Sequence, residues 1–133
     1  MGLQVAAFRD GRLADVSSPV RGSRHDSRAL EEVGWAEQIT QARRAGPLIA
    51  VIADTAYIKH TRLTPRKKPR GGHRTSQDKQ WNHRISSMRA PIERTIALLK
   101  QWRILSTGYR GRLTELPSVI HMVTNLEFYR QAT

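Results

Sequence analysis

The sequence contains no cysteine, which excludes disulfide bonds and thiolate metal sites. It also lacks long apolar runs, because the longest, Leu48 to Ala53, is far shorter than the roughly 20 residues of a membrane-spanning helix. The opening stretch MGLQVAAFRDGRL has neither the basic start nor the apolar core of a signal peptide. These absences favour a cytoplasmic protein of bacterial type, and 133 residues suffice for one hydrophobic core.

Acidic residues are scarce: 23 Lys and Arg stand against 11 Asp and Glu, for a net charge of +12. The excess is concentrated in residues 59–84, which hold nine basic residues and one acid, whereas residues 1–46 hold seven basic and six acidic residues. Such a dense basic segment, interleaved here with Trp81 and three histidines, is typical of contact with nucleic-acid phosphates. The alternatives are a solvated, disordered basic tail or a cluster like a transport signal, but the segment lies inside the chain between apolar elements, which argues against a tail.

The spacing of apolar and turn residues predicts the order of the elements. Asp10-Gly11 between apolar stretches is a strong hairpin signal, and the unbroken apolar run before Asp54 is typical of a strand covered on both faces. We expect a β-hairpin at 2–9 and 12–18, a helix at about 27–45, a central strand at 47–53, a basic loop at 59–84, a long helix within 80–105 and a last helix from about 114.

Three further predictions concern the helices. Ser23 or Asp26 can cap the first helix, because their side-chain oxygens accept first-turn N–H groups, and Gly34 is expected to break it. Pro91 must lie in the first turn of the long helix or kink it. The long helix carries one apolar stripe, formed by Ile85, Met88, Ile92, Ile96 and Leu99, and the last helix turns Leu116, Val119, Ile120 and Val123 inward.

This order predicts an α/β fold with a thin sheet, which looks like a larger sheet without its first strand. Asp54 stands at the carboxyl end of the central strand, where ligands of open α/β sheets bind, and Glu93 lies on the flank of the apolar stripe. Two or three such carboxylates can bind Mg²⁺ and support phosphodiester cleavage. The alternatives are that Asp54 is a turn or cap residue and that Glu93 only pairs with Arg89.

Four stretches, in this order, resemble bacterial insertion-sequence transposases of the DDE superfamily endonuclease type: LQVAAFRDGRLADVSSPVRGSRHDSRAL, IADTAYI, TPRKKPRGG and NHRISSMRAPIERTIALLKQWRIL. The resemblance runs from about residue 2 to residue 110. It implies an incomplete ribonuclease-H-like domain. It also implies an enzyme that cuts DNA at transposon ends and joins the freed 3′-hydroxyl to target DNA, with Mg²⁺ or Mn²⁺ held by two aspartates and a glutamate.

The resemblance assigns roles to individual residues. Asp54, followed by Tyr57 in a D-x-x-Y motif, corresponds to the second aspartate. Glu93 corresponds to the glutamate, in an R-x-x-x-E-R motif with Arg89 and Arg94. The resemblance therefore makes Asp54 and Glu93 the catalytic and metal-binding residues of this sequence.

The sequence departs from the family pattern at its front. His25 and Asp26 form the His-Asp pair of the G-S-x-H-D-S motif, a family marker, and we interpret Asp26 first as a helix cap. The first catalytic aspartate, expected in a D-G-T-like motif ahead of the hairpin, has no counterpart, and neither Asp10 nor Asp15 replaces it. Pro91, two residues before the glutamate, is a second departure.

We therefore expect residues 1–133 to be one partial transposase catalytic domain, inactive alone, nucleoid-associated, and bound to transposon-end and target DNA. An upstream-encoded transposase segment or the full-length transposase is a further expected partner. A non-catalytic DNA-binding regulator and a small RNA-binding protein are the alternative functions. The cations expected to contact DNA are Arg62, Arg66, Lys67, Lys68, Arg70, Arg74, Lys79, Arg84, Arg89 and Arg94.

Overall fold

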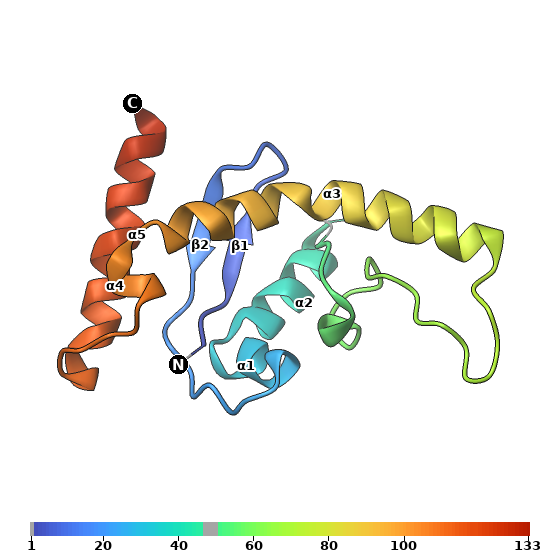
Figure 1. Cartoon of the computed structure of the whole chain (residues 1–133), viewed down its shortest axis with the longest axis horizontal. Coiled ribbons are helices and arrows are strands. Elements are labelled where there is room, and N and C mark those ends of the chain that lie inside the picture. Colours follow the sequence, from blue (N-terminus) through green and yellow to red (C-terminus); the bar gives the residue numbers. More distant parts are fainter. Residues whose placement is uncertain (1, 47–50) are drawn as a thin grey trace. The chain divides into compact units, whose positions relative to one another are not determined.

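A computed structural model describes residues 2–46 and 51–133 (Figure 1). Helices combine with a two-stranded antiparallel sheet, which confirms the α/β class. The chain divides into two compact units, one formed by Met1–Ser23 and Pro91–Thr133 and the other by Arg24–Ala90. The elements, with 3₁₀ helices labelled η, are β1 (Val5–Ala7), β2 (Leu13–Val16), α1 (Asp26–Glu32), α2 (Trp35–Ala45), η1 (Thr55–Tyr57), α3 (Ser76–Lys100), α4 (Arg103–Ser106), η2 (Leu113–Glu115) and α5 (Leu116–Ala132).

The hairpin of the first unit forms where the sequence predicts it. Val5 of β1 lies opposite Val16 of β2, and a bulge interrupts the register further along the pair. Gly11 has a φ of 91°, the left-handed conformation that a tight turn requires and that glycine adopts without strain. The regular strands are shorter than the predicted 2–9 and 12–18. The turn ends the pairing at one end, and toward the other end an isolated bridge between Gly2 and Val20 continues it.

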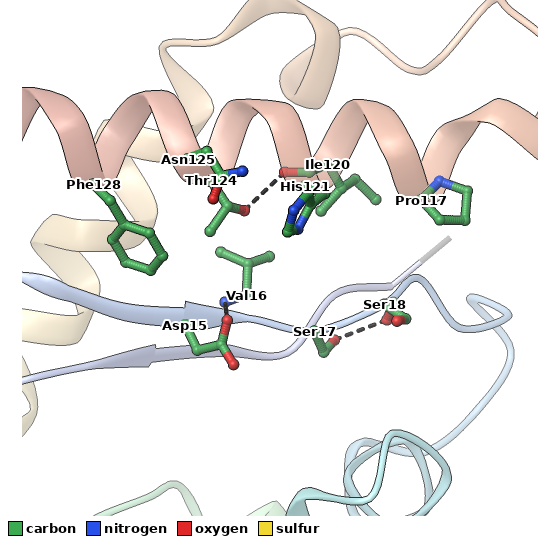
Figure 2. Close-up of a pocket in the computed structure, with 10 residues that line it drawn as sticks. All are labelled: Asp15, Val16, Ser17, Ser18, Pro117, Ile120, His121, Thr124, Asn125 and Phe128. Carbon is green, nitrogen blue, oxygen red and sulfur yellow. Dashed lines mark hydrogen bonds between the residues drawn. The ribbon is translucent and has the colours of Figure 1, made fainter.

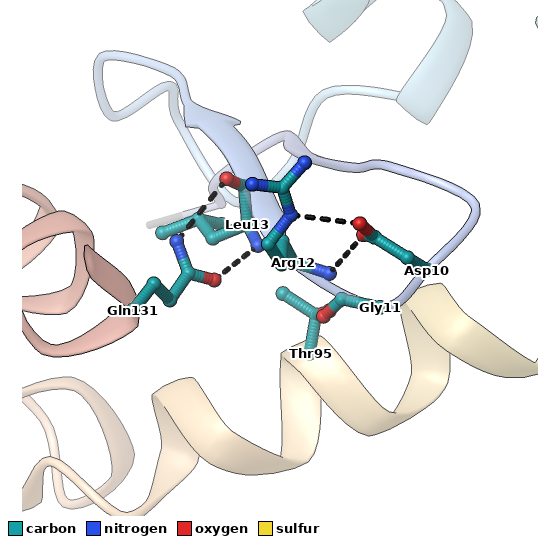
Figure 3. Close-up of polar contacts among 6 residues, drawn as sticks. All are labelled: Asp10, Gly11, Arg12, Leu13, Thr95 and Gln131. Carbon is teal, nitrogen blue, oxygen red and sulfur yellow. Dashed lines mark hydrogen bonds and ion pairs between the residues drawn. The ribbon is translucent and has the colours of Figure 1, made fainter. Parts of the chain in front are cut away.

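In the first unit, the last turns of α3 and helix α5 form hydrogen bonds with the hairpin (Figure 3). From the last turns of α3, Thr95 Oγ1 donates to the backbone oxygen of Gly11 at 2.9 Å. From α5, Gln131 Oε1 accepts from the backbone N–H of Leu13 at 2.5 Å, and Gln131 Nε2 donates to the backbone oxygen of Leu13 at 3.5 Å. The Gln131 amide thus pairs with β2 as a neighbouring strand would, which occupies polar groups at the sheet edge.

Helix α5 covers β2 in the same unit (Figure 2). Leu116, Ile120 and Val123 are buried as predicted, whereas Val119 is only half-buried. A pocket of about 130 Å³ remains between the helix and the strand. The inward spacing of apolar residues therefore places the core of this unit under α5.

In the second unit, Gly34 separates α1 from α2 with a φ of 82°, so the predicted break is confirmed. The predicted caps are wrong. The residue at the N-cap of α1 is His25, which makes no side-chain capping bond, and Asp26 is the first helical residue. A carboxylate at that position still interacts favourably with the positive end of the helix dipole.

Helix α3 is longer at its start than predicted. It begins at Ser76, so the basic segment 59–84 is a loop only up to Thr75 and helical beyond it. Ile85 and Leu99 of the predicted stripe are buried. Pro91 lies in the interior of the helix rather than in its first turn, and the boundary between the two units falls immediately before it.

The predicted central strand falls partly on residues 47–50, which lie outside the described residues. The described remainder, 51–53, contains an isolated parallel bridge between Ile52 and Leu63 and no regular strand. Ala53 N–H donates to the backbone oxygen of Leu63 at 3.1 Å. Among the helices described, none has the length and apolar content needed to cross a membrane.

Candidate functional site

Asp54 stands at the neck of a closed loop that runs from Val51 to Leu63. The loop is closed by its own polar groups, since Thr61 Oγ1 donates to the backbone oxygen of Val51 at 2.5 Å. Asp54 caps η1: its Oδ1 accepts from the backbone N–H of Thr55 at 2.6 Å. The interpretation of Asp54 as a cap residue is confirmed, and the cap leaves Oδ2 pointing elsewhere.

The second oxygen of Asp54 faces Arg89. Arg89 Nη2 lies 3.7 Å from Asp54 Oδ2, within the second unit. The Arg89 side chain is 23% exposed and that of Asp54 is 53% exposed. Two motifs that are distant in the sequence thus meet, and the ion pair of Arg89 is with Asp54 rather than with Glu93.

Glu93 lies in the first unit and is exposed. Within the described residues it makes no hydrogen bond or ion pair, so its carboxylate faces water. Mg²⁺ takes oxygen ligands, and both Glu93 and Asp54 Oδ2 have the right donor chemistry. The number of ligands falls short, because the described residues contain no group of three or more metal-binding side chains. Each carboxylate therefore has the donor chemistry of a divalent-ion ligand, and a metal site that includes both stays a prediction.

Asp15 lines the pocket between β2 and α5 (Figure 2). Its Oδ1 accepts from the backbone N–H of Val16 at 2.8 Å. It is the single carboxylate among the residues that line this pocket. One carboxylate by itself supplies too few oxygen ligands for a Mg²⁺ site, and that Asp15 does not replace a catalytic aspartate stays a prediction.

The G-S-x-H-D-S motif reaches the loop after Asp54 through its last serine. Ser27 Oγ lies 3.0 Å from His60 Nε2, and Glu31 Oε1 lies 3.4 Å from the same nitrogen. In a catalytic relay of nucleophile, base and acid, the carboxylate bonds the histidine nitrogen that does not face the nucleophile. Here Ser27 and Glu31 both contact Nε2 of His60, so the contact is structural. Sequence reasoning did not find it, because His60 was counted only as one histidine of the basic segment.

The basic segment is fastened to the start of α3. Asn82 bonds both backbone groups of Arg66: its Oδ1 accepts from the N–H at 2.7 Å, and its Nδ2 donates to the oxygen at 3.1 Å. Trp81 Nε1 donates to the backbone oxygen of Thr64 at 2.9 Å. The Arg66 guanidinium lies 5.2 Å from the Trp81 ring centre and donates to Asp78 at 2.8 Å. These contacts hold residues 64–66 against the helix.

The charges of the segment divide into paired and unpaired groups. The hydrogen bond from Arg66 holds the pKa of Asp78 below its usual value, so Arg66 already has an anionic partner. Lys59 Nζ likewise lies 3.8 Å from Glu31 Oε1. The other cations expected to contact DNA in this segment are exposed and form no ion pair with any described residue: Arg62, Lys67, Lys68, Arg70, Arg74, Lys79 and Arg84.

The first turns of α3 present some of these cations together. Lys79, Gln80, His83 and Arg84 line an open depression on the helix surface. Residues three to five apart lie on neighbouring parts of a helix face, which explains the grouping. Unpaired cations on one exposed face are suited to the phosphates of a nucleic-acid backbone. Arg94, also exposed, lies in the first unit.

Comparisons with known proteins identify relatives of the chain. The family described as DDE superfamily endonuclease matches residues 1–127. A probable transposase for insertion sequence element IS702 from Microchaete diplosiphon is 31% identical over 97 residues, which are 69% of this chain and 32% of that protein. The chain thus spans about a third of the length of this curated relative. No solved structure matches the chain.

Proposed function

This chain belongs to the DDE superfamily endonucleases, and from that premise we propose that it is part of an insertion-sequence transposase with an incomplete ribonuclease-H-like fold. The observation that carries the proposal is the contact between two family motifs. Asp54 of the D-x-x-Y motif and Arg89 of the R-x-x-x-E-R motif meet at 3.7 Å. If the two motifs only packed against each other, an exposed carboxylate would not be needed where they are in contact.

In the complete enzyme, Asp54 and Glu93 would hold Mg²⁺ or Mn²⁺ through their carboxylate oxygens, together with the first aspartate of the family pattern. Bound ions of this kind activate a water or 3′-hydroxyl and stabilise the charge that develops on the phosphate. The Thr55 N–H fixes one oxygen of Asp54 and leaves the other available. Arg89 offsets the negative charge of Asp54 and orients its free oxygen.

DNA is the partner that the family and the charge distribution support. The exposed cations of residues 59–84 bind the phosphates of transposon ends and target DNA, because phosphate contacts depend on charge rather than on base sequence. Arg66 has a different role in this proposal. Its backbone is held by Asn82 and its guanidinium by Asp78, so it fixes the loop that presents Lys67 and Lys68.

The decisive experiment supplies the first aspartate of the family pattern. We would sequence the coding DNA upstream of the Met1 codon and express any D-G-T-containing strand together with this chain. With Mn²⁺, the joined protein should cleave a transposon-end duplex, and Asp54→Asn or Glu93→Gln should abolish cleavage. Asp15→Asn is the matched control and should retain it. Cleavage that survives Asp54→Asn would refute the assignment of this site.

The chain by itself is expected to leave supercoiled plasmid intact with Mg²⁺ or Mn²⁺. Nicking by the purified chain that disappears in Asp54→Ala would contradict this expectation of inactivity.

A non-catalytic DNA-binding regulator of the full-length transposase is the second candidate. It is favoured by the described residues themselves, which carry many unpaired cations and no group of three metal-binding side chains. In this case Asp54→Asn should leave DNA affinity unchanged, and added chain should reduce cleavage by the full-length enzyme. A chain that binds DNA but never alters that cleavage would remove this candidate.

A further inference from the structure

A second basic stretch lies in the first unit, outside the segment at 59–84, and this one contains no acidic residue. From residue 94 to residue 114 the sequence has no Asp or Glu. Within it, α4 and the connection to η2 carry three exposed arginines in ten residues: Arg103, Arg110 and Arg112. We call residues 103–112 the arginine loop. None of its arginines is among the cations that the sequence assigned to DNA.

The arginine loop is built around specific contacts. Thr107 donates to the backbone oxygen of Arg103 through its N–H at 3.0 Å and through its Oγ1 at 2.7 Å, which ends α4. Gly108, with a φ of 82°, then turns the chain. The Tyr109 ring lies so close to Gly111 that a methyl group there would collide with it. The glycines and the tyrosine thus define the path along which the arginines are presented.

The guanidinium groups of the arginine loop are electrostatically unsatisfied. No ion pair joins them to any residue that the structure describes. The nearest acid in sequence, Glu115, receives a hydrogen bond from the Tyr109 hydroxyl at 3.5 Å. In the segment at 59–84, Arg66 and Lys59 have carboxylate partners and the other cations form no ion pair with described residues. Three positive charges in ten residues without a carboxylate partner would attract an external anion.

We infer that the arginine loop is a second binding surface for the phosphate backbone of duplex DNA, separate from residues 59–84. Arginine suits this role because its planar fork can bond two phosphate oxygens at once. Tyr109 lies against Gly111 through one edge of its ring, and its hydroxyl donates to Glu115 at 3.5 Å. Backbone contact without base contact binds duplex DNA irrespective of sequence. The inference rests on the proposed function for its partner, but on different residues.

The test compares three triple variants of the whole chain by fluorescence anisotropy with a short DNA duplex between about 50 and 200 mM salt. One variant replaces the three arginines of the arginine loop with glutamine. A charge-matched control replaces Arg9, Arg21 and Arg44, which are exposed and form no ion pair with described residues. Circular dichroism confirms that all variants fold.

The expected result is a fall of about 2 to 3 in the slope of log affinity against log salt for the arginine-loop variant, with the control unchanged. A slope equal to that of the control would overturn the inference.

A third variant, with Lys67, Lys68 and Arg70 replaced by glutamine, separates the two claims. If this variant loses slope and the arginine-loop variant does not, the inference fails and the proposed DNA contact at 59–84 stands. If the intact chain does not bind DNA at all, both fail. Affinity at least about tenfold higher for duplex RNA or anionic vesicles than for DNA at matched salt would overturn the choice of partner.

Discussion

Arg89 and Asp54 form an ion pair across two motifs, with 3.7 Å between Nη2 and Oδ2. Arg89 is mostly buried on α3, whereas Asp54 is half exposed at the neck of its loop. The distance exceeds that of a hydrogen bond, so the contact is electrostatic. A pair of this kind orients a carboxylate and offsets its charge while leaving the oxygen accessible.

The first prediction is that this pair contributes little to stability. A double-mutant cycle of Asp54→Asn and Arg89→Gln should give a coupling energy below about 1 kcal/mol, because water screens the exposed carboxylate. Urea unfolding at low salt measures it. The coupling should approach zero at about 1 M salt, where the screening length is about 3 Å. A coupling of several kcal/mol would mean that the pair is structural and that Asp54 is not available as a ligand.

The second prediction concerns the bond between α3 and the hairpin turn. Thr95→Val keeps the shape of this 2% exposed residue but removes the hydroxyl that donates to Gly11. We expect a loss of about 1 to 2 kcal/mol in the free energy of unfolding, because the Gly11 oxygen loses its partner. Thr124→Val is the control, since Thr124 is also buried, at 6% exposed, and donates only within its own helix, to Ile120. Equal losses in both variants would assign the effect to helix propensity instead.

Local signals in the sequence predict much of this fold. Asp10-Gly11 predicts the hairpin, Gly34 predicts the break between α1 and α2, and apolar spacing predicts α5. The density of charge predicts a loop up to residue 84, yet α3 begins at Ser76, because lysine, arginine and glutamine are good helix formers. The neglected signal is Thr75, whose Oγ1 accepts from the N–H of Asp78 at 3.1 Å, as in a helix cap.

The contacts of the candidate site are harder to predict from short stretches of sequence. Motif resemblance singles out Asp54 and Glu93, but spacing along the chain does not reveal which residues they meet. The contact of Arg89 with Asp54, and that of Asn82 with Arg66, joins residues that only tertiary packing brings together. Charge density likewise could not show that Arg66 is paired with Asp78 while its neighbours are free.

The third prediction is that Asn82→Ala releases the basic loop. The Asn82 amide occupies both backbone groups of Arg66, and alanine leaves them without these partners. Limited trypsin digestion should cut the variant faster after Arg66 and Lys67, since proteases cleave locally opened segments. Asn125→Ala, on the exposed face of α5, should digest at the wild-type rate. Unchanged cleavage in Asn82→Ala would show that other contacts hold the loop.

The fourth prediction concerns acid pH. Arg66 lowers the pKa of Asp78 in the folded protein below its ordinary value of 3.8. A carboxyl with a depressed folded pKa stabilises the fold above its unfolded pKa and loses that contribution as pH falls through the folded pKa. The Trp81 indole N–H resonance, which reports the bond to Thr64, should therefore stay constant from pH 7 to about 5 and shift below about 4.

Asp78→Asn is the control for this titration. In this variant the Trp81 resonance should already be shifted at neutral pH. Acidification should then cause no further change that depends on residue 78. A wild-type transition centred above the ordinary aspartate pKa of 3.8 would contradict the prediction for Asp78.

The fifth prediction separates the two bonds of Gln131 to Leu13. The acceptor bond to Oε1 is short at 2.5 Å, whereas the donor bond from Nε2 is long at 3.5 Å. Gln131→Glu keeps an acceptor and loses the donor, so it should cost less than about 0.5 kcal/mol in unfolding free energy, while Gln131→Ala should cost about 1 kcal/mol or more. Thermal unfolding of both variants measures the difference. Equal losses would mean that both bonds matter, and equal stability to wild type would mean that water satisfies this edge of β2.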